Sequence, residues 1–174
     1  KGNKNTLLYE SADLDHQHAL KSFMIIDASL RIAGLRDEVT VTALTLNGEG
    51  MLKILAESAL KPYLIEKNRK ALRFKFKEEH PHSPIDILRT IQALADPARD
   101  NDYSLFLGGL LGYDLVGFYH GITIPEKNRT HDMVVYLAES MVAIDHVTKT
   151  ATLQINQYGD DAELEMQLRD RFVE

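Results

Sequence analysis

The chain has 174 residues, of which 44% are hydrophobic and 26% charged, so it is long enough for one globular domain with a buried core. Its 26 acidic and 20 basic residues give a formal net charge of −6, and without a basic cluster the chain is a poor candidate for binding nucleic acid. No apolar run approaches the roughly 20 residues that span a bilayer, no signal peptide is recognisable, and the lack of cysteine excludes disulfides and thiolate chemistry. We therefore expect a soluble protein, compatible with the cytoplasm, that has neither nucleic acid nor membrane as a partner.

The two ends of the sequence suggest that it is part of something longer. It starts without Met, enters an apolar segment at once and stops in an amphipathic segment with no closing motif. We expect a single domain, residues 1–174, within a longer chain.

The first half of the sequence shows strand patterns followed by a helix pattern. The short apolar segment at 6–10 is a strand candidate, and apolar and polar residues alternate at 26–32 and 39–44, which predicts two further strands joined by a hairpin turn at 36–37. Between 26 and 32 the even-numbered residues are expected to face inward and Ser29 outward. Apolar residues then recur at helical spacing over 49–60.

The middle of the sequence predicts a strand at 71–76 and then a well-marked helix. Ser83 is expected to be its N-cap, with Pro84 at the first helical position and Asp86 near the positive end of the helix dipole. The pair Asp96-Pro97 is expected to end this helix.

The last third predicts a strand that begins at 104, a long strand at 133–144, a turn at 145–149, a strand at 151–155 and a helix at about 160–172. In the strand at 151–155, alternation predicts that Ala151, Leu153 and Ile155 face the core. Because most strands follow one another through short turns and helices occur singly, the sequence predicts an α+β fold with antiparallel sheet and outer helices.

A cluster of glycines lies in the segment FLGGLLGYDLVG at 106–117. Gly108 and Gly109 suggest a bulge or a sharp bend, where a Cβ would be forbidden. The segment is not a dinucleotide-binding fingerprint, because the G-x-G-x-x-G spacing is missing and no clear helix is expected after Gly112.

Two pairs of histidines have a spacing that could suit a metal ion, His16 with His18 and His80 with His82. Both pairs lie in polar, loop-like surroundings without cysteine or an acidic helix motif. Solvated histidines are therefore the favoured interpretation, and no metal ligand is predicted.

A third candidate is Glu10-Ser11-Ala12-Asp13, followed by Lys21. A free amino acid needs an acceptor for its ammonium group and a cation or N–H donors for its carboxylate, and these residues could supply both. An ordinary junction between a strand and a turn, with charged side chains at the surface, explains the same residues.

Together, two segments resemble the amino-terminal half of anthranilate synthase component I, a family of chorismate-using enzymes. They are LLYESADLDHQHALKSFMIIDASLRIAGL at 7–35, with its ESAD core, and FLGGLLGYDLVG at 106–117. A third, VYLAESMVAIDHVTKTATLQ at 135–154, resembles the hairpin that follows in the family. The resemblance implies half of the chorismate-enzyme fold, with orthogonally packed antiparallel sheets.

The resemblance also implies a function. The full enzyme would convert chorismate and glutamine or ammonia to anthranilate and pyruvate for tryptophan biosynthesis, with Mg²⁺ and the catalytic residues in a carboxy-terminal half that this sequence lacks. A glutamine amidotransferase subunit would be its partner. This chain would contain part of the feedback site for L-tryptophan, with Ser11 as the best-placed residue and Glu10, Ala12 and Lys21 beside it.

Two alternatives to this function remain open, and the motifs argue against a third. Aminodeoxychorismate synthase component I shares the glycines and the Tyr-Asp-Leu at 113–115, although the ESAD segment fits it less well. Isochorismate and salicylate synthases share chiefly the half that this sequence lacks. A free-standing amino-acid-binding module is the alternative outside the enzymes.

Overall fold

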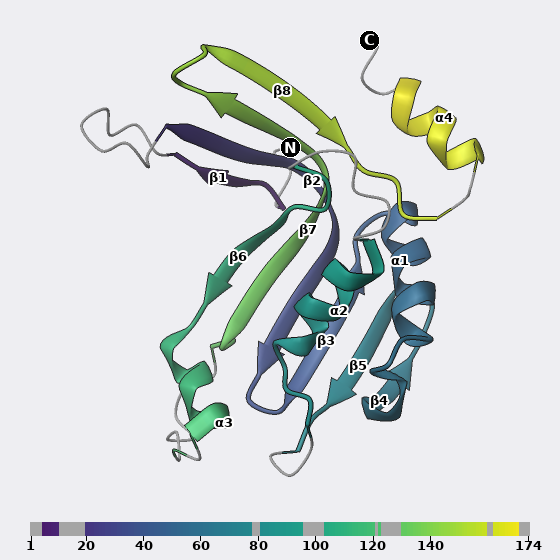
Figure 1. Ribbon diagram of the computed structural model, residues 1–174. Coiled ribbons are helices and arrows are strands. Elements are labelled where there is room, and N and C mark those ends of the chain that lie inside the picture. Colours follow the sequence, from purple (N-terminus) through teal and green to yellow (C-terminus); the bar gives the residue numbers. More distant parts are fainter. Residues whose placement is uncertain are drawn as a thin grey trace.

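Two long antiparallel strands, β2 (Lys21–Leu35) and β7 (Met133–Asp145), form the centre of the computed structural model (Figure 1). They pair from Lys21 opposite Asp145 to Gly34 opposite Met133, with register shifts between Ile25 and Leu30. The structure describes residues 5–10, 20–77, 81–95, 103–120, 122, 130–159 and 162–170.

The other strands extend this pair into one eight-stranded antiparallel sheet. Its order is β4-β5-β3-β2-β7-β6, with β1 added to the first part of β2 and β8 to the last part of β7. The bounds of these strands are β1 (Leu7–Tyr9), β3 (Glu38–Ala43), β4 (Leu64–Lys67), β5 (Ala71–Lys75), β6 (Leu107–Leu111) and β8 (Thr150–Ile155).

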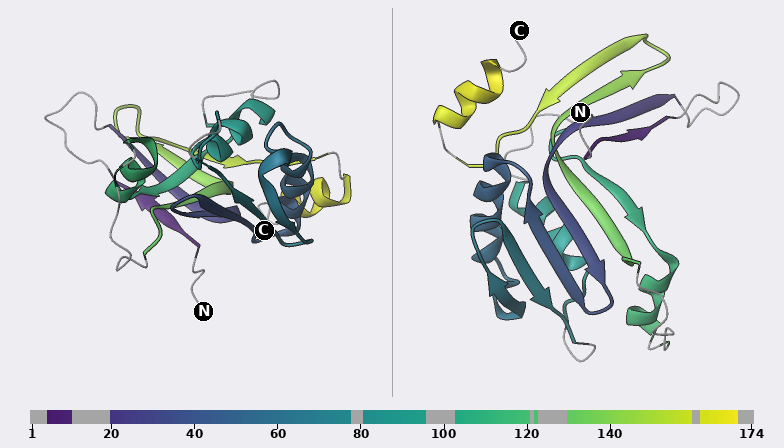
Figure 2. Two further views of the ribbon diagram at one scale, coloured as in Figure 1. Left: turned by 90° about the horizontal axis from the view of Figure 1, so that it is seen from below. Right: turned by 180° about the vertical axis from the view of Figure 1, so that it is seen from behind.

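The sheet bends where the register of β2 and β7 shifts. Figures 1 and 2 show β1 and β8 on one side of this bend and β3, β4, β5 and β6 on the other. Bulges increase the local twist and bend a strand, and they also change which residues face which side of the sheet. Ser29, which alternation placed outside, is fully buried for this reason.

Helices α1 (Leu46–Ala56) and α2 (Asp86–Ala95) pack over the half of the sheet that contains β3 and β5. Their buried residues join those of the strands in the main core, among them Leu55, Ile91, Ile32 and Phe74. Helices α3 (Val116–His120) and α4 (Ala162–Asp170) lie farther out in Figure 1. Turns of 3-10 helix in the described part of the chain are η1 (Lys61–Tyr63) and η3 (Tyr113–Leu115). No described helix is long and apolar enough to cross a membrane.

A second, smaller core lies across the bend, on the part of the sheet that contains β1. Its buried residues are Ile25, Ala28, Ala138, Met141 and Ala143. Aromatic side chains from β2 and from the segment before β6 pack against it, namely Phe23, Tyr103 and Phe106. Phe23 and Phe106 of this aromatic layer form the base of the candidate site.

The predicted α+β class, with antiparallel sheet and outer helices, is confirmed. The hairpin β2–β3 and the long strand β7 lie where the sequence predicts them. Helix α2 begins at Asp86, two residues after the predicted first position Pro84, and the Ser83 amide and hydroxyl both donate hydrogen bonds to the Asp86 carboxylate. Helix α1 starts earlier than predicted because Thr45 caps it, its side chain accepting a hydrogen bond from the amide of Gly48. The predicted end of α2 at Asp96-Pro97 lies outside the described residues.

Three predictions in the last third were wrong. Gly108 and Gly109 lie inside β6, which pairs with β7 in unbroken register, so they form neither a bulge nor a bend. A short helix, α3, follows Gly112 after one turn of 3-10 helix. Strand β8 exists, but Leu153 is 46% exposed because β8 pairs only with β7 and its apolar face is not packed in either core.

Candidate functional site

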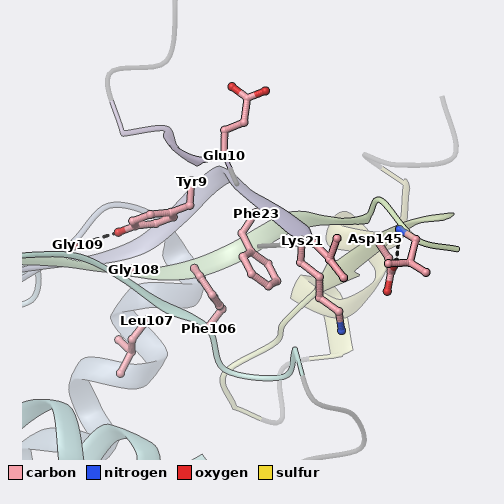
Figure 3. Close-up of a pocket in the computed structure, with 11 residues that line it drawn as sticks. Tyr9, Glu10, Lys21, Phe23, Phe106, Leu107, Gly108, Gly109 and Asp145 are labelled. Atoms are coloured by element: carbon pink, nitrogen blue, oxygen red, sulfur yellow. Dashed lines mark hydrogen bonds between the residues drawn. The ribbon is translucent and has the colours of Figure 1, made fainter. Parts of the chain in front are cut away.

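A groove with a volume of about 960 Å³ opens beside β1, the start of β2 and β6 (Figure 3). Its lining comes from four segments of the chain, within 9–10, 20–23, 106–109 and 145–147. Antiparallel strand pairing brings these four segments together. Tyr9 lies opposite Phe23, Lys21 opposite Asp145, and β6 borders the other edge of β7.

The base of the groove is aromatic. The rings of Phe23 and Phe106 stack with centroids 5.4 Å apart and an angle of 26° between their planes. The ring of Tyr9 is edge-on to that of Phe106, with centroids 6.3 Å apart. Such a surface favours a flat apolar group, because ring faces bury large areas and stack in offset or edge-on geometries.

Lys21 supplies a positive charge at one end of the groove. Its Nζ donates a hydrogen bond of 3.0 Å to the hydroxyl of Tyr103 and lies 5.4 Å from the centre of that ring. Asp145, its partner across the strands, accepts hydrogen bonds from the amides of Val147 and Thr148. The Thr148 amide above all, with that of Val147 and a smaller contribution from the charge of Lys21, lowers the pKa of Asp145.

The glycines of β6 bring the backbone itself to the groove. The hydroxyl of Tyr9 donates a hydrogen bond of 3.0 Å to the carbonyl oxygen of Gly109. Burial raises the pKa of Tyr9. A Cβ on Gly108 would lie 2.9 Å from the Phe106 ring and 3.0 Å from the Tyr9 ring, so the lack of a side chain there leaves room for both rings.

The four residues predicted for the amino-acid site have different outcomes. Glu10 and Lys21 both line the groove. In Figure 3 the carboxylate of Glu10 points away from Lys21 and from the aromatic base. Ser11 and Ala12 lie outside the described residues, and their roles stay predictions. The connection that contains them starts at Glu10 and ends at Leu20, and both of these residues line the groove.

Sequence reasoning missed the aromatic base and Tyr103. Phe23 could have been found, since it lies two residues after Lys21 and therefore on the same face of the strand. The contact of Phe23 with Phe106 joins segments 83 positions apart and has no local signal.

The histidine pairs give no metal site in the described part of the chain. Among the described residues, no three His, Asp or Glu side chains gather closely enough to hold an ion. His82 has its Nδ1 3.8 Å from Asp86 and its ring against Tyr63, while His16, His18 and His80 lie outside the described residues.

Comparison with known proteins points to one family name. No family model matches the chain. It is 34% identical over 184 residues to anthranilate synthase component 1 of Vibrio cholerae, a match that covers 99% of this chain and 35% of that protein. The corresponding protein of Escherichia coli is 35% identical over 187 residues, covering 97% and 35% of the two chains. That of Serratia marcescens is 35% identical over 178 residues, covering 95% and 34%.

Among solved structures, anthranilate synthase component I from Streptococcus pneumoniae aligns with a TM-score of 0.46 and 17% identity, over 93% of this chain and 31% of that one. The chain spans about a third of the length of the curated relatives it matches. Over nearly all of its residues, the chain is therefore related to anthranilate synthase component I, as its motifs indicate.

Proposed function

We propose that this chain is the amino-terminal regulatory portion of an anthranilate synthase component I, and that the groove binds L-tryptophan as a feedback inhibitor. One observation supports this most strongly. Glu10 and Lys21 from the first resembling segment meet Gly108 and Gly109 from the second at the same groove, about a hundred residues apart in sequence.

The chemistry of the groove suits an aromatic amino acid. The stacked rings of Phe23 and Phe106 offer a flat apolar surface for the indole ring. The ammonium group of Lys21 can bind the ligand carboxylate through a charge-assisted hydrogen bond. The Glu10 carboxylate points away from the aromatic base, so we propose that acceptors for the ligand ammonium group come from the connection after Glu10, which contains Ser11 and Ala12.

The full enzyme is proposed to convert chorismate and glutamine or ammonia to anthranilate and pyruvate in the cytoplasm. Its relatives are about three times as long as this chain, so we assign catalysis to the part of the enzyme that this chain does not match. We propose a glutamine amidotransferase subunit as the source of ammonia. The described residues do not fit the Mg²⁺ that the family implies, since they contain no cluster of ligands, and we assign that ion to the remaining part too.

Inhibition of the full-length synthase by L-tryptophan tests the proposal. Removing one hydrogen bond to a charged ligand group should weaken binding by roughly 1.5–3 kcal/mol, or about ten- to a hundredfold. Ser11→Ala and Lys21→Met should therefore each raise the half-inhibitory tryptophan concentration by about that factor, with each variant measured against its own uninhibited rate.

Lys70→Met is the matched control, because Lys70 is exposed between β4 and β5, at the opposite edge of the sheet from β6. It should leave inhibition unchanged. Normal sensitivity to tryptophan in both Ser11→Ala and Lys21→Met would remove the inhibitor site from this groove.

A further inference from the structure

We propose that Tyr103 is a positioning residue for the regulatory site, which holds the Lys21 ammonium group at the groove for the carboxylate of the ligand. This inference rests on the tryptophan site proposed above and adds a residue to it. Its basis is the pair of contacts between Lys21 Nζ and Tyr103, a hydrogen bond of 3.0 Å to the hydroxyl and a distance of 5.4 Å to the ring centre.

Lys21 needs such a partner because of its place in the fold. It is the first residue of β2 and is exposed. A lysine side chain has four rotatable bonds and loses much conformational freedom when its ammonium group is held at one point. If the free protein already holds that group, ligand binding does not have to order it, and affinity rises.

Tyr103 is itself held by the aromatic base of the groove. Its ring packs against Phe23 with centroids 5.9 Å apart, and Phe23 stacks on Phe106. The side chain of Tyr103 is only partly exposed, in the segment that leads into β6. The Lys21 ammonium group is therefore connected to the same rings that we propose to receive the indole.

The Tyr103 hydroxyl also suits the Lys21 ammonium group because it has no charge. A carboxylate hydrogen-bonded to the ammonium group would compete directly with an incoming carboxylate, whereas the Tyr103 hydroxyl is neutral. Asp145, the acidic residue opposite Lys21 across the strands, accepts hydrogen bonds at Oδ1 from the amides of Val147 and Thr148, both at 2.9 Å.

The test is a double-mutant cycle in the full-length synthase. Tyr103→Phe keeps the ring and its packing but removes the hydroxyl, and it should raise the half-inhibitory L-tryptophan concentration by about three- to tenfold. In a Lys21→Met background, Tyr103→Phe should have no further effect, because the hydroxyl acts only through the ammonium group. A purely structural role of Tyr103 would give the same change in both backgrounds.

Tyr119→Phe is the control, since it also removes one side-chain hydrogen bond, that of 2.9 Å to Ser83, from a tyrosine of α3, which follows the end of β6 away from Lys21 (Figure 1). It should leave inhibition unchanged. If Lys21→Met weakens inhibition and Tyr103→Phe does not, or if the two effects simply add, the positioning role is refuted while the tryptophan site stands. If Lys21→Met has no effect either, the proposed site fails, and the role of Tyr103 with it.

Discussion

At Gly109 the chain comes too close to its neighbour for any side chain. A Cβ there would lie 2.1 Å from the carbonyl oxygen of Val134 and 2.5 Å from the Cα of Val135, both backbone atoms of β7. At Gly108 the nearest atoms belong instead to the side chains of Phe106, Tyr9 and Ile25. Two adjacent glycines in one strand thus have different reasons for lacking a side chain.

Substituting each glycine by alanine should separate these reasons. Gly109→Ala must displace β6 from β7, and we expect it to lower the free energy of unfolding by about 2–4 kcal/mol. Gly108→Ala can be accommodated by small rotations of the rings and should cost about 1 kcal/mol. Urea unfolding of both variants measures the difference, and equal losses would show that backbone contact does not explain Gly109.

Asp86 gives a prediction for the dependence of stability on pH. Burial raises the pKa of its carboxyl group, but hydrogen bonds from the Ser83 amide at 2.7 Å, from Arg89 at 2.9 Å and from the Ser83 hydroxyl outweigh burial and lower it overall. A lowered folded pKa means that the stabilisation is fully present above the unfolded value, about 3.9, and is lost as the pH falls through the folded value.

Asp86→Asn should therefore lower the free energy of unfolding by about 1 kcal/mol at pH 7, and the difference from the unsubstituted chain should shrink below about pH 4. Asp170→Asn, at an exposed position of α4, should show no such loss. The prediction would be contradicted if the difference in the free energy of unfolding between Asp86→Asn and the unsubstituted chain stayed constant from pH 7 to pH 3.

Among the elements, α1 is tied to the central strand through its cap. Thr45 accepts a hydrogen bond from the Gly48 amide at 3.1 Å and donates one of 2.5 Å to Glu139, a carboxylate of β7 that is only 1% exposed. Thr45→Val keeps the shape but loses both bonds, and it should lower the free energy of unfolding by about 2–3 kcal/mol. Thr45→Ser should recover most of that loss, and similar losses for both variants would refute the linkage.

How far elements can be predicted depends on whether their signal is local. Alternation along β7 and the turn between β2 and β3 depend on neighbours in sequence, and both were predicted. The exposure of Leu153 was not, because what covers β8 is decided by elements distant in sequence. The burial of Ser29 was missed because a bulge exchanges the two faces of β2, and simple alternation assumes that they stay the same.

The candidate site shows the same division. Glu10 and Lys21 were predicted from a resembling segment and do line the groove. Phe106 and Tyr103 reach Phe23 and Lys21 only through the fold of the whole sheet, so no pattern in one segment indicates them.

At the scale of the whole molecule, this chain alone should not be a synthase. It matches about a third of the length of its relatives, and we place chorismate and Mg²⁺ in the remainder. The purified chain should form no fluorescent anthranilate from chorismate with Mg²⁺ and ammonium, even at high concentration. Turnover that survives controls for contamination would show that catalysis was assigned to the wrong part.

A structure of the full-length enzyme with L-tryptophan bound would test the proposed regulatory groove most directly. We predict the indole ring against Phe23 and Phe106, and the ligand carboxylate within about 3 Å of Lys21 Nζ, the distance of a charge-assisted hydrogen bond. The Tyr103 hydroxyl should still contact the same ammonium group. Tryptophan bound elsewhere, with this groove empty at a saturating concentration, would contradict the proposal.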